Sequence, residues 1–262
     1  MHVRGLPARC SMNQATAVVI PRDLHHALHR ARFVAALTGA GISAESGVAT
    51  FRDAQTGLWA RFDPRELATP GAFARNPKRV WDWYAWRRER VAAVEPNAGH
   101  RALVELERRV SEFLLITQNV DGLHQRAGSR KLVELHGNIA RVKCSREGTI
   151  IEHWSAEEDE VPRCANCGAF LRPDVVWFEE MLPEHALVAA EDAARRCDVL
   201  LVIGTSAEVY PAAGLPMLTH RRGALVVEIN PNETPLSSRV DYVLRGASGV
   251  VLPQLVSAPW TL

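Results

Sequence analysis

A glycine-rich segment crowded with polar side chains runs from Leu37 to Asp53. Within it, Gly39, Gly41 and Ala44 have the spacing Gly-x-Gly-x-x-Ala, which is typical of a turn that binds the pyrophosphate of a dinucleotide. The first glycine would make the tight turn, the second would let the backbone approach the phosphates, and the small third residue would let a helix pack on the preceding strand. A plain strand–turn–helix unit has the same spacing, but it does not need the Ser, Glu and Arg side chains that follow here.

A second polar cluster, Gln118–Asp121, follows the apolar run Phe113–Thr117. Ligands of open α/β sheets bind beyond the carboxyl ends of the strands, so amide and carboxylate groups at this point are placed for chemistry. The alternative is a polar turn in which Asn119 and Asp121 only cap backbone groups.

A third candidate is His136, which precedes Gly137 and follows a strand-like segment over 132–135. An imidazole with an ordinary pKa of about 6.5 can accept a proton at neutral pH. The glycine would let another backbone segment come close. A lone histidine beside a strand is often structural, so its position alone leaves both roles open.

The elements that would position these groups alternate between apolar strands and helices. Strands are expected over 33–37, 113–117, 199–203 and 225–229, and helices over 22–32, 77–94, 97–109, 183–196 and 211–222. Apolar strands separated by helices are typical of a parallel sheet that is covered on both faces, so the predicted fold class is α/β. Residues 57–76 are interrupted by Pro and Gly, which indicates a loop-rich lid over a bound ligand.

The bulk properties of the chain exclude some classes of protein. Its 262 residues have a formal net charge of +1, which gives no indication of nucleic-acid binding. No apolar run is long enough to span a bilayer, and residues 1–16 are expected to be a disordered extension without the apolar core of a secretory signal. Five cysteines, an odd number without a regular framework, favour a reducing compartment and hence the cytoplasm.

Together, the glycine-rich segment, the Gln-Asn-x-Asp cluster and the His-Gly pair resemble the signature of the sirtuins, the NAD-dependent protein deacylases. The resemblance extends from about Asp23 to the C-terminus. It implies a Rossmann-like, doubly wound parallel sheet with a small zinc-ribbon-like insert and a helical insert. It also implies that NAD is bound by Gly39, Ala40, Gly41, Ser43, Glu45, Thr50, Phe51, Arg52, Trp59, Gln118, Asn119, Val120, Asp121, Gly204, Thr205, Ser206, Asn230, Pro231, Asn232 and Ser248.

The same resemblance assigns catalysis to His136 and Asn119. It implies that the carbonyl oxygen of an acylated lysine attacks C1′ of the NAD ribose as nicotinamide leaves, and that His136 then deprotonates a ribose hydroxyl. A Rossmann-type oxidoreductase would usually have an acidic residue at the kind of strand end where Asn230 stands, which disfavours that class. A protein mono-ADP-ribosyltransferase that uses the same pocket stays open as an alternative.

A structural metal site is incomplete relative to the family pattern of two Cys-x-x-Cys pairs around one zinc ion. Cys164 and Cys167 form the second pair, whereas the first pair has only Cys144, with Glu147 where its partner would be. Zinc could be completed by Glu147, His153 or a water, or the module could pack without metal.

The substrate residues implied by the resemblance are Tyr84, Arg87, Ala68, Val176, Trp177 and Phe178. Tyr84 and Arg87 lie three apart on an expected helix and match the branch of the family that removes succinyl and malonyl groups, because a guanidinium and a phenol can bind a terminal carboxylate. The alternative is an amphipathic helix with its aromatic residues in the core and Arg87 in solvent. Ala68 would leave room for a longer acyl group, and residues 175–178 would pair with the substrate peptide. Glu179 stands where the family more often has Gly.

The predicted domain organisation follows from these assignments. The NAD-binding domain would comprise residues 17–47, 96–137 and 174–262, interrupted by a helical insert over 48–95 and a small zinc-type module over 138–173. The expected reaction is removal of acyl groups from lysine side chains of proteins, without nucleic-acid or membrane partners.

Overall fold

The apolar runs of the sequence form a six-stranded parallel sheet with the order β3-β2-β1-β7-β8-β9. The computed structural model describes residues 18–49, 67–155 and 160–257. The strands are β1 (Phe33–Thr38), β2 (Glu112–Thr117), β3 (Leu132–Glu134), β7 (Val199–Ile203), β8 (Leu225–Ile229) and β9 (Tyr242–Leu244). Because the strand order reverses between β1 and β7, a crevice for a ligand is expected at the carboxyl ends of these two strands.

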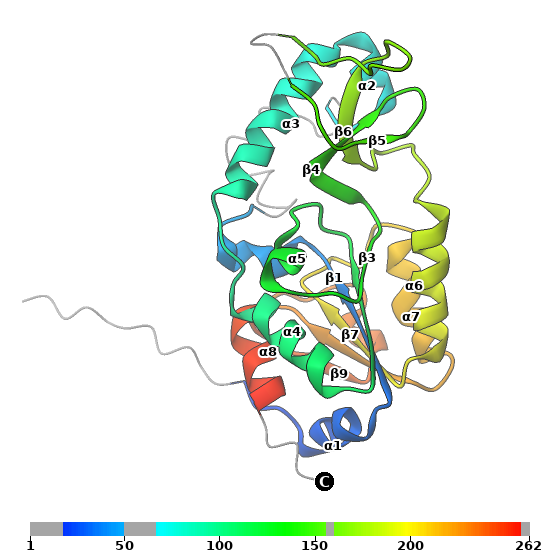
Figure 1. Ribbon diagram of the computed structural model, residues 1–262. Helices are drawn as coiled ribbons and strands as arrows, with labels where there is room; N and C mark the ends of the chain where they lie inside the picture. Colours follow the sequence, from blue (N-terminus) through cyan, green and yellow to red (C-terminus); the bar gives the residue numbers. More distant parts are fainter. Residues whose placement is uncertain (1–17, 50–66, 156–159, 258–262) are drawn as a thin grey trace, which may run out of the picture.

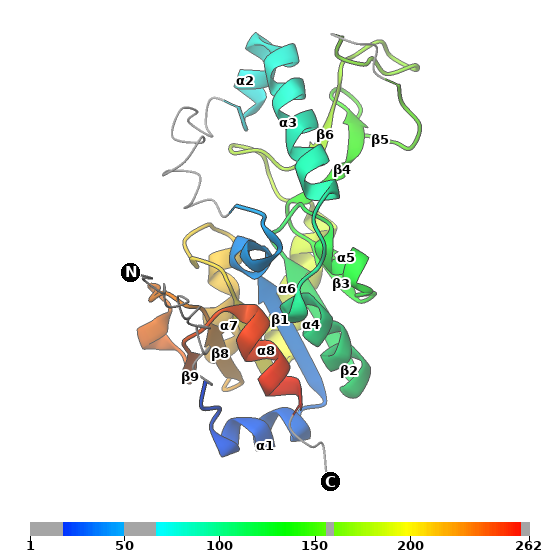
Figure 2. The same ribbon diagram turned by 90° about the vertical axis from the view of Figure 1, so that its left-hand side faces the viewer.

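Helices cover both faces of this sheet, as the apolar strands predict (Figures 1 and 2). On one face lie α1 (Arg22–Arg30), α4 (Ala98–Arg109) and α8 (Ser248–Ser257), and on the other lie α6 (Glu184–Arg196) and α7 (Leu215–His220). Successive residues of β1 alternate between the two cores, since Val34 packs beneath the first set of helices and Ala35 beneath the second. The fold is therefore the doubly wound α/β class that the sequence predicts.

A second, antiparallel sheet has the order β5-β4-β6 and forms a smaller layer beyond the carboxyl ends of the large sheet (Figure 1). Its strands are β4 (Gly137–Cys144), β5 (Ile150–Ile151) and β6 (Leu171–Val175). The helices α2 (Pro70–Arg75) and α3 (Pro77–Ala92) pack on it through an apolar core that includes Tyr84, Ile139 and Trp177. A short helix, α5 (Leu123–Ala127), follows β2.

Side-chain caps fix where several helices begin. The side chain of Asn97 accepts hydrogen bonds at the start of α4, as the sequence predicts, and Asn76 does the same for α3 ahead of Pro77. Two expected helices differ from the prediction. The segment after the glycine turn is a 3₁₀ helix, η1 (Ala40–Ser46). The helix expected over 211–222 is divided into η5 (Ala212–Gly214) and α7. A further short 3₁₀ helix, η6 (Ser237–Arg239), lies between β8 and β9.

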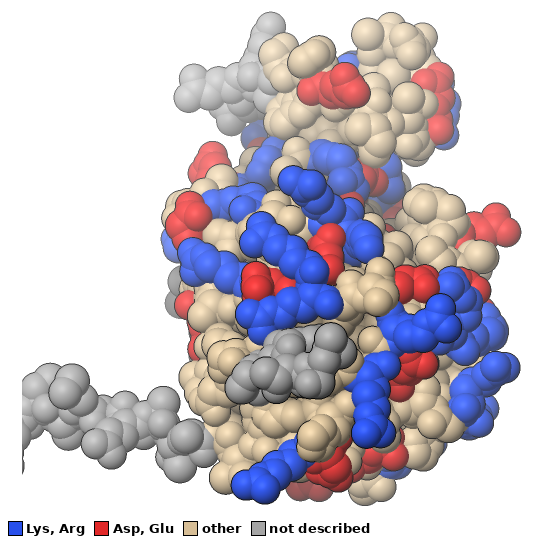
Figure 3. All heavy atoms as spheres, turned by 60° about the horizontal axis from the view of Figure 1, so that its bottom comes forward, with Lys and Arg blue, Asp and Glu red and all other residues tan. Residues whose placement is uncertain are grey.

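The division at Gly214 has a local cause. Pro216 lies in the first turn of α7, and proline has no N–H with which to continue the preceding helical turn. On the surface, positive and negative side chains are interspersed over the face drawn in Figure 3. In the part of the chain that the structure describes, no helix is long and apolar enough to cross a membrane.

Candidate active site

Four loops at the carboxyl ends of β1, β2, β7 and β8 are joined by hydrogen bonds. The N–H of Gly41 donates to the carbonyl of Gly204 at 2.8 Å, and Gln118 Nε2 donates to Thr205 Oγ1 at 3.1 Å. Asn230 Nδ2 donates to the Thr205 carbonyl at 2.9 Å. The structure thus brings together the described residues of the predicted dinucleotide site, with Ala40 in η1, Val120 after β2, Ser206 after β7, and Pro231 and Asn232 after β8.

The glycines of the fingerprint are required by contacts between these loops. A Cβ at Gly41 would lie 2.7 Å from the Gly204 backbone, and one at Gly39 would lie 2.8 Å from Thr205 Cβ. Gly204 itself has a φ of +57° and would place a Cβ 2.5 Å from the Ile42 nitrogen. The sequence predicts that Gly41 admits a pyrophosphate, and the structure adds a second reason, which is close packing of the loops after β1 and β7.

At the centre of the crevice, Ser43 uses all its hydrogen-bonding capacity. Its hydroxyl donates to Asp121 Oδ2 at 2.7 Å and accepts from Asn119 Nδ2 at 3.2 Å. His100 Nε2 lies 3.4 Å from the same oxygen. Because His100 Nδ1 accepts the N–H of Asn97 at 3.3 Å, Nε2 carries the proton and donates to Ser43. Ser43 therefore holds Asn119 and Asp121 in fixed positions.

The carboxyl group of Asp121 has an unusual electrostatic environment. Burial raises its pKa above the ordinary value, whereas the hydrogen bonds from Ser43 and from the Leu123 N–H and the charge of Arg87 lower it. Only 7% of the residue is exposed. A buried carboxylate with these partners can accept hydrogen bonds from hydroxyl groups of a bound sugar.

His136 lies between the two sheets with one ring nitrogen committed. Its Nδ1 is 2.8 Å from the carbonyl oxygen of Gln118, which can only accept, so Nδ1 carries the proton and Nε2 has the lone pair. Burial lowers the pKa of His136, which keeps the ring neutral at pH 7 and lets Nε2 act as a base. The close approach expected at Gly137 is confirmed, because a Cβ there would lie 2.2 Å from the Asp174 carbonyl oxygen.

Two predicted cofactor residues, Glu45 and Ser248, are hydrogen-bonded to each other within the protein. The carboxylate of Glu45 accepts the N–H of Gly249 at 2.6 Å and the hydroxyl of Ser248 at 3.3 Å, at the beginning of α8. A carboxylate is stabilised there by the helix dipole. Four further predicted residues, Thr50, Phe51, Arg52 and Trp59, lie outside the described part of the chain.

The predicted substrate residues surround one aromatic cluster at the base of the small sheet. Tyr84 is 1% exposed and its hydroxyl accepts a hydrogen bond from Trp177 Nε1 at 3.0 Å. The guanidinium of Arg87 lies 4.8 Å from the ring centre of Trp83 and 5.5 Å from that of Tyr84. Tyr84 is thus buried in the apolar core beneath α3, as expected for a simple amphipathic helix. Arg87, however, is half-buried over the aromatic rings, whereas a simple amphipathic helix would place it in solvent.

Ala68 and Phe178 meet in the adjoining segment. The N–H of Phe178 donates to the Ala68 carbonyl at 3.0 Å, and the N–H of Val176 donates to the His136 carbonyl at 2.9 Å. The segment after β6 is therefore tied on one side to the residues before α2 and on the other to the candidate base. Glu179 follows with a φ of +73°, a conformation that favours glycine.

The predicted metal ligands gather at the far end of β4 from Gly137. One ligand atom each of Cys144, Glu147, Cys164 and Cys167 lies within 4.8 Å of all the others. Four ligands at about 2.3 Å from a tetrahedral zinc ion would be about 3.8 Å apart, so this group fits zinc. Of the three completions that the sequence leaves open, the geometry favours Glu147, whose Oε2 lies 3.9 Å from Cys164 Sγ.

Two buried histidines belong to the site and were not predicted from the sequence. His100 and His124 have ring centres 4.8 Å apart, and burial lowers the pKa of His100 to about 4 and that of His124 to about 3. His124 Nε2 lies 3.0 Å from Thr38 Oγ1, which donates to Thr117 Oγ1 at 2.9 Å. A signal was available, because His100 interrupts the apolar face of α4.

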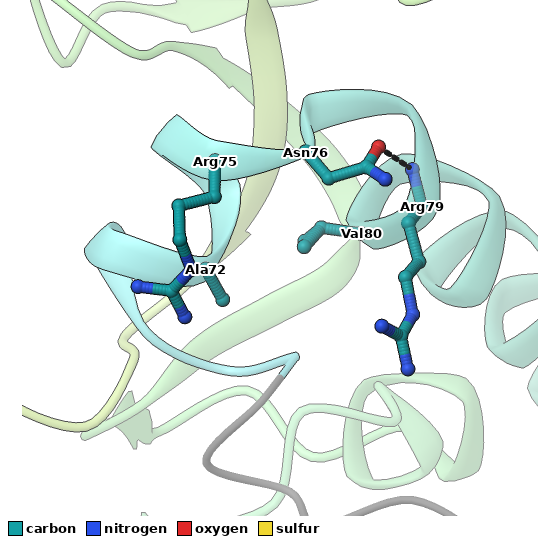
Figure 4. A pocket seen from close by; sticks show the side chains of 5 residues that line it. All are labelled: Ala72, Arg75, Asn76, Arg79 and Val80. Carbon is teal, nitrogen blue, oxygen red and sulfur yellow. Dashed lines mark hydrogen bonds between the residues drawn. The ribbon is translucent and has the colours of Figure 1, made fainter.

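A separate hollow lies between α2 and α3, away from the strand ends. It has a volume of about 290 Å³ and is lined by Ala72, Arg75, Asn76, Arg79 and Val80 (Figure 4). The Asn76 side chain accepts the Arg79 N–H there, which is the cap of α3. None of these residues belongs to the predicted site.

A doubly wound sheet with a polar crevice at its strand switch and a Cys-rich antiparallel module defines a class of nucleotide-binding α/β protein. Within that class the chain belongs to the Sir2 family, whose model matches residues 39–211.

Relatives and solved structures agree with this membership. The NAD-dependent protein deacylase 1 of Archaeoglobus fulgidus is 51% identical over 226 residues, which cover 86% of this chain and 92% of that protein. A Sir2 homologue solved as a complex with NAD has a TM-score of 0.86 at 48% identity, covering 92% of this chain and 94% of that one. A Sir2 structure with a p53 peptide and NAD⁺ has a TM-score of 0.76 at 32% identity, covering 89% and 96%.

Proposed function

We propose that this chain is an NAD-dependent protein-lysine deacylase, which transfers the acyl group to ADP-ribose and releases nicotinamide. The observation that carries the proposal is the pairing of a fixed Ser43–Asn119–Asp121 cluster with a neutral His136 whose Nε2 is available as a base. The deacylase name of the Archaeoglobus relative supports it.

The donor and acceptor groups of the crevice fit NAD. Amide groups of Gln118, Asn119 and Asn230 and the carboxylate of Asp121 match the ribose hydroxyls and the carboxamide of a dinucleotide. NAD is consumed in this reaction, so it is a substrate that supplies the ADP-ribose acceptor. The Sir2 homologue solved with NAD supports this assignment.

In this proposal His136 performs the proton transfer and Asn119 orients the reacting ribose. The Gln118 carbonyl holds the proton on Nδ1, so that Nε2 keeps the lone pair with which it would accept the proton. Asn119 is held by two contacts, one from its side chain to Ser43 and one from its N–H to Thr117 Oγ1 at 3.0 Å. Fixed groups of this kind need no reorganisation when the substrates bind.

We infer that the protein partner is a peptide with an acylated lysine, bound along residues 176–178. All three N–H groups of this segment already have internal acceptors, namely His136, Glu180 and Ala68. A substrate peptide would therefore donate its own N–H groups to carbonyls of the segment. The Sir2 structure with a p53 peptide supports a protein substrate.

We further infer that the acyl groups include succinyl and malonyl as well as acetyl. Arg87 lies over the rings of Trp83 and Tyr84 on one face of α3, and these two rings belong to the apolar cluster that Trp177 and Ala68 also join. Burial raises the pKa of Tyr84, so the phenol keeps its proton and can donate to a carboxylate. The guanidinium would form the ion pair.

Zinc would have a structural role in the small module. With Cys144, Cys164, Cys167 and Glu147 as ligands, the ion would connect the end of β4 to the loop before β6. Cys144 Sγ and Cys167 Sγ lie 3.4 Å apart and are not linked, which fits a reducing compartment, and we propose the cytoplasm.

Nicotinamide release from NAD, measured with acetyl-lysine, succinyl-lysine and unmodified peptides, tests the proposal. A deacylase releases nicotinamide only with the acylated peptides and gives a free lysine and an O-acyl-ADP-ribose in equal amounts. Release with unmodified protein and attachment of labelled ADP-ribose would establish the transferase instead. Formation of reduced cofactor absorbance without nicotinamide would establish an oxidoreductase.

A further inference from the structure

Arg141 joins the two sheets of the molecule with one guanidinium group. It lies where the pairing of β4 with β6 shifts register between Asn138 and Val142. Its Nε donates to Asp174 Oδ2 at 2.9 Å, and its Nη2 donates to Glu134 Oε2 at 2.6 Å. Glu134 is the last residue of β3 in the large sheet, whereas Asp174 lies on β6 of the small sheet.

The segment that these contacts enclose contains His136. Glu134 precedes the histidine by two residues, and Asn138, which follows it by two, donates to Glu134 Oε1 at 2.7 Å. The Leu135 N–H donates to the Thr117 carbonyl, and the His136 carbonyl accepts the Val176 N–H. Main-chain hydrogen bonds thus attach the segment around His136 to the large sheet and to the segment that follows the small sheet. Arg141 in turn connects the two sheets to each other.

The two ion pairs of Arg141 are partly shielded from solvent, so they can hold the two sheets in a fixed relative position. Side chains of Glu134 and Asp174 are each 14% exposed, although that of Arg141 is 41% exposed. A single Arg whose guanidinium donates to two mostly buried carboxylates has a defined geometry, unlike an isolated surface pair. Lys143 Nζ contacts only Asp174 in this group, at 3.3 Å from Oδ1, and does not reach the large sheet through Glu134.

We propose that Arg141 is a positioning residue for His136. This inference rests on the proposed function, in which His136 transfers a proton after nicotinamide has left. A misplacement of a reacting group by about 1 Å can reduce a rate about a hundredfold. Loss of the Arg141 bridge should therefore slow the step that uses His136 and leave the earlier release of nicotinamide intact.

The experiment compares Arg141→Gln with Lys143→Gln, which removes a cation from the same cluster without removing the bridge. For Arg141→Gln we expect formation of O-acyl-ADP-ribose to fall about tenfold or more, with nicotinamide exchange and the KM for NAD within about twofold of wild type. Arg141→Lys keeps the charge but cannot donate to both carboxylates in the same way, so its rate of O-acyl-ADP-ribose formation should lie between those of Arg141→Gln and Lys143→Gln. Glu134→Gln combined with Arg141→Gln should be no worse than the worse single variant.

Equal losses in exchange and product formation would overturn the proposal, because they indicate a merely structural role, and so would unchanged product formation. The Nδ1–H signal of His136 in a ¹⁵N-histidine NMR spectrum gives a readout that does not depend on activity. It should shift or broaden in Arg141→Gln and not in Lys143→Gln. If the wild type released no nicotinamide with acyl peptides, the proposed function would fail, and the NMR comparison would still decide whether Arg141 positions the ring.

Discussion

Replacing Arg87 by methionine removes a guanidinium that lies over the rings of Trp83 and Tyr84 and acts on the charge of Asp121. If Arg87 binds the terminal carboxylate of a succinyl group, this change leaves that carboxylate without its ion-pair partner. An acetyl group has no terminal charge, so it loses nothing at this point. The two substrates should therefore respond differently to the same substitution.

The size of the difference follows from the burial of the pair. Truncating one partner of a buried, hydrogen-bonded charge pair costs about 2–5 kcal/mol, and the half-buried position of Arg87 favours the lower end. At about 1.4 kcal/mol per tenfold, a loss of about 2 kcal/mol lowers kcat/KM for the succinyl peptide about 30-fold relative to the acetyl peptide. A smaller loss common to both substrates is also expected, since Arg87 lowers the pKa of Asp121 in the NAD site.

The assay measures kcat/KM for acetyl and succinyl peptides of one sequence with wild type, Arg87→Met and Arg87→Lys. The lysine variant keeps the charge near Asp121, so it should restore the common loss, but it lacks the planar fork and should not restore the full preference. Tyr84→Phe is a poorer test, because it leaves the buried Trp177 Nε1–H without its acceptor and costs stability of about 1–3 kcal/mol. A folded Arg87→Met enzyme with an unchanged ratio of the two activities would refute the carboxylate site.

Four further outcomes are expected. His136→Ala should lower deacylation about 10²-fold or more in a variant whose circular dichroism is unchanged, and near-normal activity would remove His136 from the mechanism. Cys164→Ser should lose bound zinc and thermal stability together, whereas elemental analysis that finds no zinc in active wild type would establish a metal-free module. Glu179→Gly should stabilise the protein by about 0.5–1 kcal/mol in urea unfolding, because φ is +73° there, and a loss of stability would contradict this. Burial lowers the pKa of His100 to about 4 and of His124 to about 3. Both histidines are thus neutral in the folded protein at about pH 5, and between about pH 6.5 and about pH 5 only the unfolded chain takes up protons at these two positions. The free energy of unfolding should then fall by about 1.4 kcal/mol per pH unit for each histidine, and equal urea midpoints at pH 7 and pH 5 would contradict it.

The strands of the large sheet could be predicted from the sequence because each is a short apolar run followed by polar or glycine residues. The carboxyl ends of parallel strands lie at one edge, so the Gly39–Gly41 turn and the Gln118–Asp121 cluster could be expected to meet. Proline and asparagine also marked the beginnings of α3 and α4. These are local signals, and the structure confirms them.

The remaining features depend on contacts between residues far apart in the chain. The first turn of η1 packs closely against Gly204, and no local pattern in the sequence contains this contact. His100 and His124 are partners of Ser43 and Thr38 only after α4, α5 and β1 have come together. Arg141 is one of many arginines until the register shift in β4 directs it between two carboxylates.

The influence of Arg87 on Asp121 has a consequence for the proton balance of substrate binding. A carboxylate bound to Arg87 offsets part of the guanidinium charge, which weakens its effect on Asp121 and raises the pKa of that buried carboxyl group. At a pH where Asp121 titrates, binding of a succinyl peptide should therefore be accompanied by proton uptake, whereas binding of an acetyl peptide should not. Calorimetric titrations in two buffers of different ionisation enthalpy measure this difference directly. Equal heats in both buffers for the succinyl peptide, at every pH of a series from neutral to acidic, would mean that the acyl and NAD sites titrate independently.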